Sequence, residues 1–294
     1  EVRKAYANCE VILSGGSLQS PQILQLSGIG PAELLKKHDI PIIFDSPEVG
    51  QNLQDHYQVR GIVKLKNNNG SVNNQSRSPF KIAEWGIRWL LFGSGPLTCG
   101  AGQVGGAACS KFSKEGRPDL QFNVMPLSVD KPGEPLHNYP GFTASVWQCH
   151  PESRGSLKIK STNPKEQAEI RPEYLSTKLD QNVIVDGIKM IRSIFNQPSF
   201  RDLWEKEMLP GESVKSDEEI LHWAKHNGGT VFHAVGTCRM GNDNKSVVDE
   251  ELNVRGVENL RVIDASVMPQ VTSANTNAPS LMIGEKGVSF ITKN

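Results

Sequence analysis

Residues 11–17, VILSGGS, decide the fold class, because an apolar run that ends in two glycines is typical of a β-strand leading into a tight turn. Near the other end of the chain, residues 260–266, LRVIDAS, repeat this arrangement of a short apolar strand followed by a polar turn. Strands of this kind next to helical segments are typical of α/β domains. We therefore expect an α/β domain that is built from both ends of the chain.

The chain between these ends has a different pattern. Residues 57–66 and residues 120–124 alternate between apolar and polar side chains, which indicates half-buried strands. The predicted fold class combines α/β and α+β, with a mainly antiparallel sheet inserted into the α/β domain. The predicted boundaries assign residues 1–56 and 227–294 to the α/β domain and residues 57–226 to the inserted one.

Local signals place several helices. The spacing of apolar residues predicts helices over residues 81–92 and 180–195. Ser216 and Glu219 have the spacing of a capping box and predict a helix start there. A last helix is expected from Pro279 to Ile291, because proline is favoured at the first helical position.

Three further predictions concern local packing. Ser20 and Pro21 are expected to be the cap and the first residue of a helix. Trp85 and Trp89 lie four residues apart on one predicted helix face and are expected in a core. The polar residues 67–78 are expected to form a mobile loop.

Composition excludes some classes of function. The 294 residues include 32 basic and 32 acidic side chains, so the net charge is zero and a nucleic-acid partner is not expected. The apolar run at residues 89–92 is far too short to span a bilayer. Five cysteines without a CxxC pair predict reduced thiols and a cytoplasmic location, with peripheral membrane association as the alternative. Because the chain has no initiator Met and begins just before a strand, we expect it to be part of a longer protein.

Several stretches together resemble the glucose-methanol-choline (GMC) oxidoreductases, and they occur in the order found in that family. They are residues 16–31 (GSLQSPQILQLSGIGP), 49–56 (VGQNLQDH), 151–156 (PESRGS), 232–241 (FHAVGTCRMG) and 261–279, which contain RVIDAS and NTNAP. The closest similarity is to choline-dehydrogenase-like bacterial members.

This resemblance implies an FAD-dependent enzyme that oxidises a CH–OH group, with an alcohol as substrate and either oxygen or a quinone-type molecule as electron acceptor. The chain departs from the family in lacking the amino-terminal Gly-x-Gly-x-x-Gly turn, which receives the FAD pyrophosphate. We therefore expect a separate amino-terminal half to complete the α/β domain as the FAD-binding domain. The chain alone is expected to be inactive.

The resemblance assigns the chemistry to two residues. His233 corresponds to the family's catalytic base, and a pKa of about 6.5 suits histidine to that task. Asn275 occupies the position of a second His or Asn and would hydrogen-bond the substrate oxygen. The alternatives are a histidine that pairs with local backbone and an asparagine that caps a helix.

Seven further residues are predicted to lie near FAD on the same grounds: Gly15, Gly16, Asn52, Asp264, Ala265, Thr276 and Asn277. The glycines would let the backbone approach the adenosine side. The helix start near Pro279 would stabilise negative charge on reduced flavin. The alternatives are a ligand-free strand-to-helix turn for the glycines and an inter-domain turn for the segment around Asn52.

Two other functions remain open at this point. The first is a non-catalytic binding or partner module, such as one half of a split flavoprotein that is inactive alone. A nicotinamide-dependent dehydrogenase is the weaker rival, because the dinucleotide-binding turn is missing. No metal site is expected, because His222 and His226 have no third ligand nearby in the sequence.

Overall fold

The computed structural model describes residues 3–67, 70–98, 100, 102–130 and 133–292. These residues divide into two compact units. Unit 1 comprises residues 1–56, 150–177 and 230–294, and unit 2 comprises residues 57–149 and 178–229.

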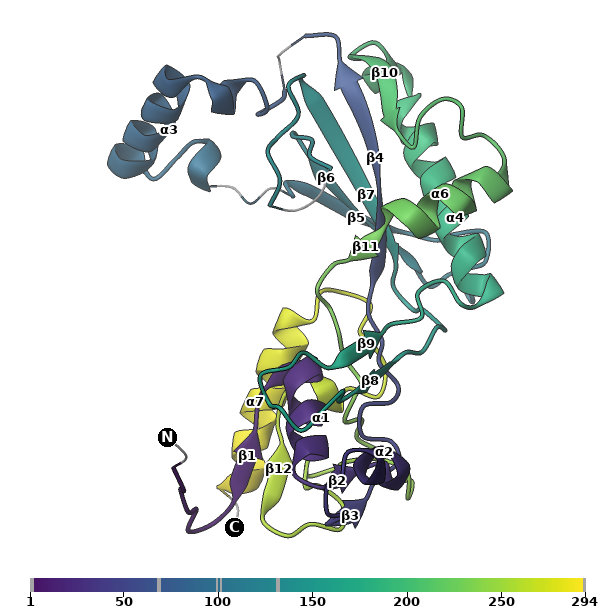
Figure 1. Ribbon diagram of the computed structural model, residues 1–294. Coiled ribbons are helices and arrows are strands. Elements are labelled where there is room, and N and C mark those ends of the chain that lie inside the picture. Colours follow the sequence, from purple (N-terminus) through teal and green to yellow (C-terminus); the bar gives the residue numbers. More distant parts are fainter. Residues whose placement is uncertain (1–2, 68–69, 99, 101, 131–132, 293–294) are drawn as a thin grey trace. The chain divides into compact units, whose positions relative to one another are not determined.

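Unit 1 is a mixed α/β unit (Figure 1). Its elements are β1 (Val11–Leu13), α1 (Gly16–Leu26), β2 (Ile29–Gly30), α2 (Ala32–Lys37), β3 (Phe44–Asp45), β8 (Ser156–Lys158), β9 (Glu169–Arg171), β12 (Leu260–Val262), η3 (Ala265–Val267) and α7 (Asn277–Ile291). Strands β1 and β12 pair in parallel, with Val11 opposite Leu260 and Leu13 opposite Val262. The two ends of the chain therefore build one structure, as the sequence predicts.

Residues 150–177 were expected in the inserted domain, but the structure places them in unit 1. Leu53 and Gly155 exchange two backbone hydrogen bonds, of 3.0 and 2.8 Å. The buried Gln25 amide donates to the carbonyl of Leu157 and accepts from the backbone N–H of Ile159. Residues 157–160 alternate between apolar and charged side chains as in a half-buried strand, but the polar backbone groups of this segment find their partners in the α/β unit.

Helix α1 begins at Gly16, five residues before the predicted first helical residue, Pro21, and so contains that proline. Proline has no N–H to give to the carbonyl four residues earlier. In α1 that carbonyl belongs to Ser17, and it accepts a hydrogen bond of 2.7 Å from the hydroxyl of Thr237 instead. The prediction of a helix start at Ser20 and Pro21 was wrong because a distant side chain replaces the missing donor.

Unit 2 is built on an antiparallel sheet with the strand order β10-β4-β7-β6-β5 (Figure 1). Its elements are β4 (Tyr57–Leu65), η1 (Gln75–Arg77), α3 (Pro79–Phe92), η2 (Pro96–Thr98), β5 (Val104–Ala108), β6 (Leu120–Met125), β7 (Gly141–Gln148), α4 (Lys178–Phe195), α5 (Pro198–Arg201), β10 (Trp204–Leu209) and α6 (Asp217–Asn227). At the unit boundary, the two-residue β11 (Gly229–Thr230) also pairs with β4. The capping box of α6 is confirmed, since both of its reciprocal hydrogen bonds are present.

Helices α4 and α3 of unit 2 differ in what they contact. Helix α4 packs on β4 and β7 of the sheet, whereas the principal neighbours of α3 are the short helices η1 and η2. Trp85 is buried as expected, but the prediction for Trp89 was wrong, because that side chain is 52% exposed. Helical spacing placed both residues on one face, and only part of this face is covered.

Residues 67–78 are not a loose loop where the structure describes them, although residues 68 and 69 lie outside the description. Asn73 is fully buried. Its amide donates to the carbonyls of Ser128, His137 and Tyr139 and accepts from the backbone N–H of Ser128. A polar sequence can thus be ordered when one asparagine satisfies the backbone of another loop.

In the part of the chain that the structure describes, no helix is both long and apolar enough to cross a membrane.

Candidate active site

Residues 52–56 of unit 1 pair with the loop that carries His233. Gln54 and Val235 exchange two backbone hydrogen bonds, of 3.0 and 2.9 Å, and the N–H of Val231 donates to the carbonyl of His56 at 3.2 Å. The loop therefore lies antiparallel to the segment. This pairing brings together residues that are about 180 positions apart in the sequence.

Asp55 fixes the backbone of this loop. Its buried carboxylate accepts hydrogen bonds from the N–H of His233 at 2.9 Å, from the hydroxyl of Tyr174 at 2.5 Å and from the hydroxyl of Thr230. Phe232, next to His233, has a φ of +63°, a left-handed conformation that is uncommon for an aromatic residue. Three donors around one carboxylate offset the cost of burying its charge and hold the strained turn in place.

The side chain of His233 lies against that of His56. Their Nδ1 atoms are 2.9 Å apart, and the two rings meet edge to face at an angle of 87°. His56 is fully buried and His233 is 7% exposed. Burial lowers the pKa of His233, and the nearby Asp55 carboxylate acts in the opposite direction. A neutral imidazole near neutral pH can accept a proton, as a general base must.

Asn52 joins the His233 loop to a third segment. Its amide donates to the carbonyls of Gly236 and Pro269, both at 3.3 Å, and its backbone has a φ of +58°. Gly236 has a φ of +92°, and a Cβ there would lie 2.4 Å from the carbonyl oxygen of Asn52. Gln54 also contacts this third segment, through Pro269 and Val271. The Asn52 side chain therefore fixes the backbone of the His233 loop and of the third segment.

The structure brings four of the residues predicted to lie near FAD together at the carboxyl ends of β1 and β12. The carboxylate of Asp264 accepts from the N–H of Gly16 at 2.9 Å and from the hydroxyl of Ser20 at 2.5 Å. The same hydroxyl accepts from the N–H of Gly15. Asp264 also caps η3, which begins at Ala265. These hydrogen bonds join the turn after β1 to the turn after β12, which are far apart in the sequence.

Thr276 and Asn277 form the start of α7, which begins at Asn277. The helix starts two residues earlier than predicted, and Pro279 is accommodated because the first-turn N–H groups have no partner within the helix. Thr276, the cap residue, makes no side-chain cap hydrogen bond. Asn275 immediately precedes this start and is exposed.

These features fit the binding of a dinucleotide cofactor. Ligands of α/β sheets bind beyond the carboxyl ends of parallel strands, where Gly15 and Gly16 lie. Gly16 has a φ of +75°, and a Cβ built on it meets no atom of the described residues within 4 Å. The start of α7 offers N–H groups without a side-chain cap to a group with negative charge. For metals, no cluster of three or more His, Cys, Asp or Glu suited to an ion occurs among the described residues.

Sequence reasoning missed the residues that hold His233. The family resemblance placed the segment VGQNLQDH, which contains Asp55 and His56, near the flavin, but it assigned neither residue a contact with His233. A buried acid next to a histidine is a signal for a structural or catalytic role. The sequence could not, however, show that these two residues contact a loop near position 233.

Models of the family described as GMC oxidoreductase match residues 1–58 and 151–284. An alcohol dehydrogenase [acceptor] from Pseudomonas putida is 39% identical over 292 residues, covering 97% of this chain and 51% of the relative. An oxygen-dependent choline dehydrogenase from Pseudomonas savastanoi pv. phaseolicola is 37% identical, covering 96% of this chain and 49% of the relative. The chain thus spans about half the length of the curated relatives it matches.

Solved structures match in the same way. A formate oxidase from Aspergillus oryzae, studied for its FAD modification, is 28% identical with a TM-score of 0.89. The match covers 98% of this chain and 55% of the oxidase chain. The mixed α/β fold with an antiparallel sheet is therefore about half of a known fold.

Proposed function

We propose a function for this chain from its family, since it belongs to the GMC oxidoreductases and is choline-dehydrogenase-like. The chain contributes the catalytic base and the substrate-binding domain of an FAD-dependent enzyme that oxidises alcohols. On this proposal unit 1 is part of the FAD-binding domain and unit 2 is the substrate-binding domain. The pyrophosphate-binding turn would come from an amino-terminal half, and this chain alone would be inactive.

The observation that carries the proposal is the setting of His233. The imidazole is buried, its pKa is lowered by that burial, and its backbone is held by the Asp55 carboxylate. With Nδ1 in contact with His56, Nε2 is the ring nitrogen left to face a substrate. A neutral histidine with one nitrogen held and the other directed at a hydroxyl is the usual arrangement of a general base.

Alcohol oxidation requires removal of the hydroxyl proton and of a hydride from the carbon. FAD, when bound, supplies the hydride acceptor at its N5 atom. His233 takes the hydroxyl proton at Nε2 and becomes an imidazolium. Asp55 lowers the free energy of this positive charge, since the carboxylate raises the pKa of His233. Asn275 is proposed to hydrogen-bond the substrate oxygen and fix its orientation.

The cofactor would be held by residues on both segments of unit 1. Gly15, Gly16, Asp264 and Ala265 lie together at the strand ends, where the backbone would approach the phosphate and adenosine parts. Thr276 and Asn277 would present the start of α7 to the flavin ring. Asn52 would lie near the flavin through the backbone that it holds.

The substrate class follows from the relatives, whose names specify an alcohol and choline. A primary alcohol is therefore the first substrate to test. Oxygen, named for the choline dehydrogenase relative, and a quinone-type acceptor are the two candidate electron acceptors.

The test is anaerobic reduction of the flavin in the complete, FAD-loaded protein by choline and by a series of aliphatic and aryl alcohols. Loss of flavin absorbance with at least one alcohol is expected, and it should depend on His233. His226→Ala is the matched control, because His226 is exposed on α6. A fully loaded enzyme that no alcohol reduces would contradict the proposal, and flavin retained by this chain alone after dialysis would contradict the need for a second half.

A further inference from the structure

We infer that His56 is a positioning residue that accepts a hydrogen bond from Nδ1 of His233 and thereby fixes the tautomer in which Nε2 of His233 can act as a base. This inference rests on the proposed function of His233. It goes further by assigning a specific task to a residue that does not itself face the substrate.

The geometry requires one shared proton. The two Nδ1 atoms lie 2.9 Å apart, which is a normal hydrogen-bond distance. Two N–H groups or two lone pairs facing each other at this distance would repel. One ring must therefore donate and the other accept, and since His56 is fully buried and His233 nearly so, water does not readily replace either partner.

The chemistry sets the direction of this hydrogen bond. A neutral imidazole has one N–H and one lone pair. If His56 donated, His233 would carry its proton on Nε2 and could only donate to an alcohol. If His233 donates, its Nε2 has the lone pair that can take the hydroxyl proton. His56 then carries its own proton on Nε2.

Two consecutive residues therefore hold His233 at two places. Asp55 accepts from its backbone N–H at 2.9 Å, and His56 accepts from its ring. The rings meet at 87°, so rotation of the His233 ring about its axis would break the contact. When His233 gains a proton, its Nδ1–H bond becomes charge-assisted and stronger. The same contact thus sets the resting tautomer and stabilises the protonated form.

The first experiment locates the proton and does not depend on turnover. The complete, FAD-loaded protein with ¹⁵N-labelled histidine is studied by NMR near neutral pH, and the signal of His233 is assigned from its loss in His233→Ala. A protonated Nδ1 and an unprotonated Nε2 on His233 are expected. The opposite tautomer, or a solvent-averaged mixture, overturns the inference even if His233 proves essential for catalysis.

The second experiment uses two replacements of His56 with different chemistry. His56→Leu removes the acceptor, and flavin reduction should slow on the order of ten- to a hundredfold, the effect of one hydrogen bond to a charged group. KM and FAD content should change little. His56→Asn places an amide oxygen near the position of Nδ1, and should recover most of the rate and the Nδ1-protonated tautomer of His233.

These outcomes separate a positioning role from a merely structural one. His226→Leu controls for loss of a histidine outside this site. Equal rates in His56→Leu and the parent, or no recovery in His56→Asn despite an unchanged melting temperature, count against the inference. If His56→Leu does not fold, the tautomer in the parent protein still decides. Failure of the proposed function would look different, because His233→Ala would then leave flavin reduction unchanged.

Discussion

Two regions of the molecule differ in which side chains they bury. One is segment 52–56 together with the His233 loop, and the other is helix α3. In the first region Gln54, Asp55, His56 and His233 are polar, yet all four are buried and each has a hydrogen-bond partner. In α3, apolar side chains are largely exposed: Phe80 at 88%, Leu90 at 75%, Leu91 at 66% and Phe92 at 74%.

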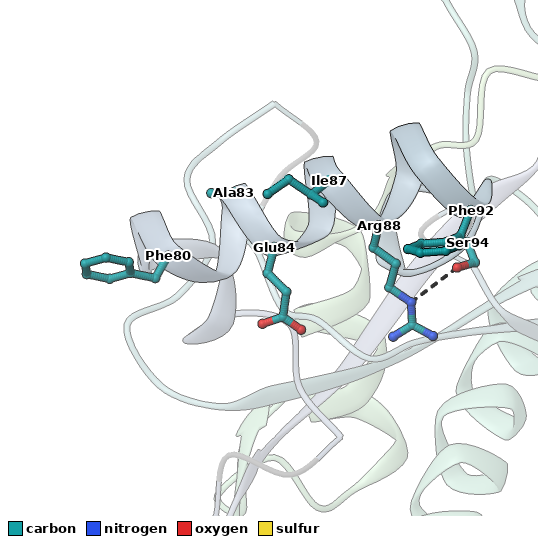
Figure 2. A pocket seen from close by; sticks show the side chains of 7 residues that line it. All are labelled: Phe80, Ala83, Glu84, Ile87, Arg88, Phe92 and Ser94. Carbon is teal, nitrogen blue, oxygen red and sulfur yellow. Dashed lines mark hydrogen bonds between the residues drawn. The ribbon is translucent and has the colours of Figure 1, made fainter.

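Figure 2 shows the side chains along α3 that line a pocket, among them Phe80, Ile87, Arg88 and Phe92. Arg88 donates to Ser94, within the same part of the chain. Helix α3 therefore exposes apolar side chains to solvent, whereas the region around His233 buries polar side chains away from it. Buried polar side chains indicate function more clearly than exposed apolar ones here, because several hydrogen bonds hold the buried groups in place. Substitutions in the two regions should therefore have very different effects.

The largest effect is expected at His233. In the complete, FAD-loaded protein His233→Ala should slow flavin reduction on the order of a hundred- to ten-thousandfold, the usual contribution of a positioned general base. FAD content should be unchanged, because this side chain is assigned to the substrate. Rapid-reaction absorbance of the flavin measures the rate. A rate near that of the parent would contradict the assignment of His233 as the base.

Asn275→Ala should be milder. Loss of one orienting hydrogen bond costs about 1–3 kcal/mol when its partner is left unpaired, which is roughly a five- to two-hundredfold loss of rate. The same rapid-reaction measurement applies. An effect larger than that of His233→Ala would reverse the assignment of roles in this region.

Asp55→Asn tests the effect of the Asp55 carboxylate charge on the pKa of His233. The carboxylate raises the pKa of His233, so its removal should move the acid limb of the flavin-reduction pH profile to lower pH. The amide also leaves some of the three donors poorly satisfied, which should lower the free energy of unfolding by about 1–3 kcal/mol. A limb that moves to higher pH would contradict the electrostatic argument.

The parent protein gives a related pH dependence. Because burial lowers the folded-state pKa of His233, the folded protein binds fewer protons than the unfolded chain. Its contribution to stability is therefore fully present above the unfolded pKa of about 6.5 and is lost as pH falls through the folded value. Urea midpoints measured between pH 5 and 8 should fall on the acid side less steeply in His233→Ala.

The smallest effect is expected in α3. Leu90→Ser should change the free energy of unfolding by less than about 0.5 kcal/mol, as is usual for exposed positions. The matched substitution Leu120→Ser, on a fully buried position of β6 in the same unit, should cost about 3 kcal/mol or more. Urea unfolding of both variants measures the difference. A large loss at Leu90 would show that this face is covered in the complete protein.

How far the sequence could predict the structure depended on the distance between interacting residues. The capping box of α6, the strands near both chain ends and the antiparallel sheet follow from short-range patterns, and the structure has them. The start of α1 and the burial of Asn73 depended on partners far away in the chain, at Thr237 and around Ser128. No local pattern contains these partners.

The sequence by itself determined the family, the mixed fold class and the position of His233 within a recognisable loop, because composition, periodicity and ordered motifs are local properties of the chain. Only the tertiary structure decided that Asp55 holds the backbone of His233 and that His56 contacts its ring. It also decided that nearly all of α3, except Trp85, is left exposed. The physical reason is the same in each case: burial and hydrogen bonding of a side chain are set by the segments that fold against it, and those segments are separated from it by many residues.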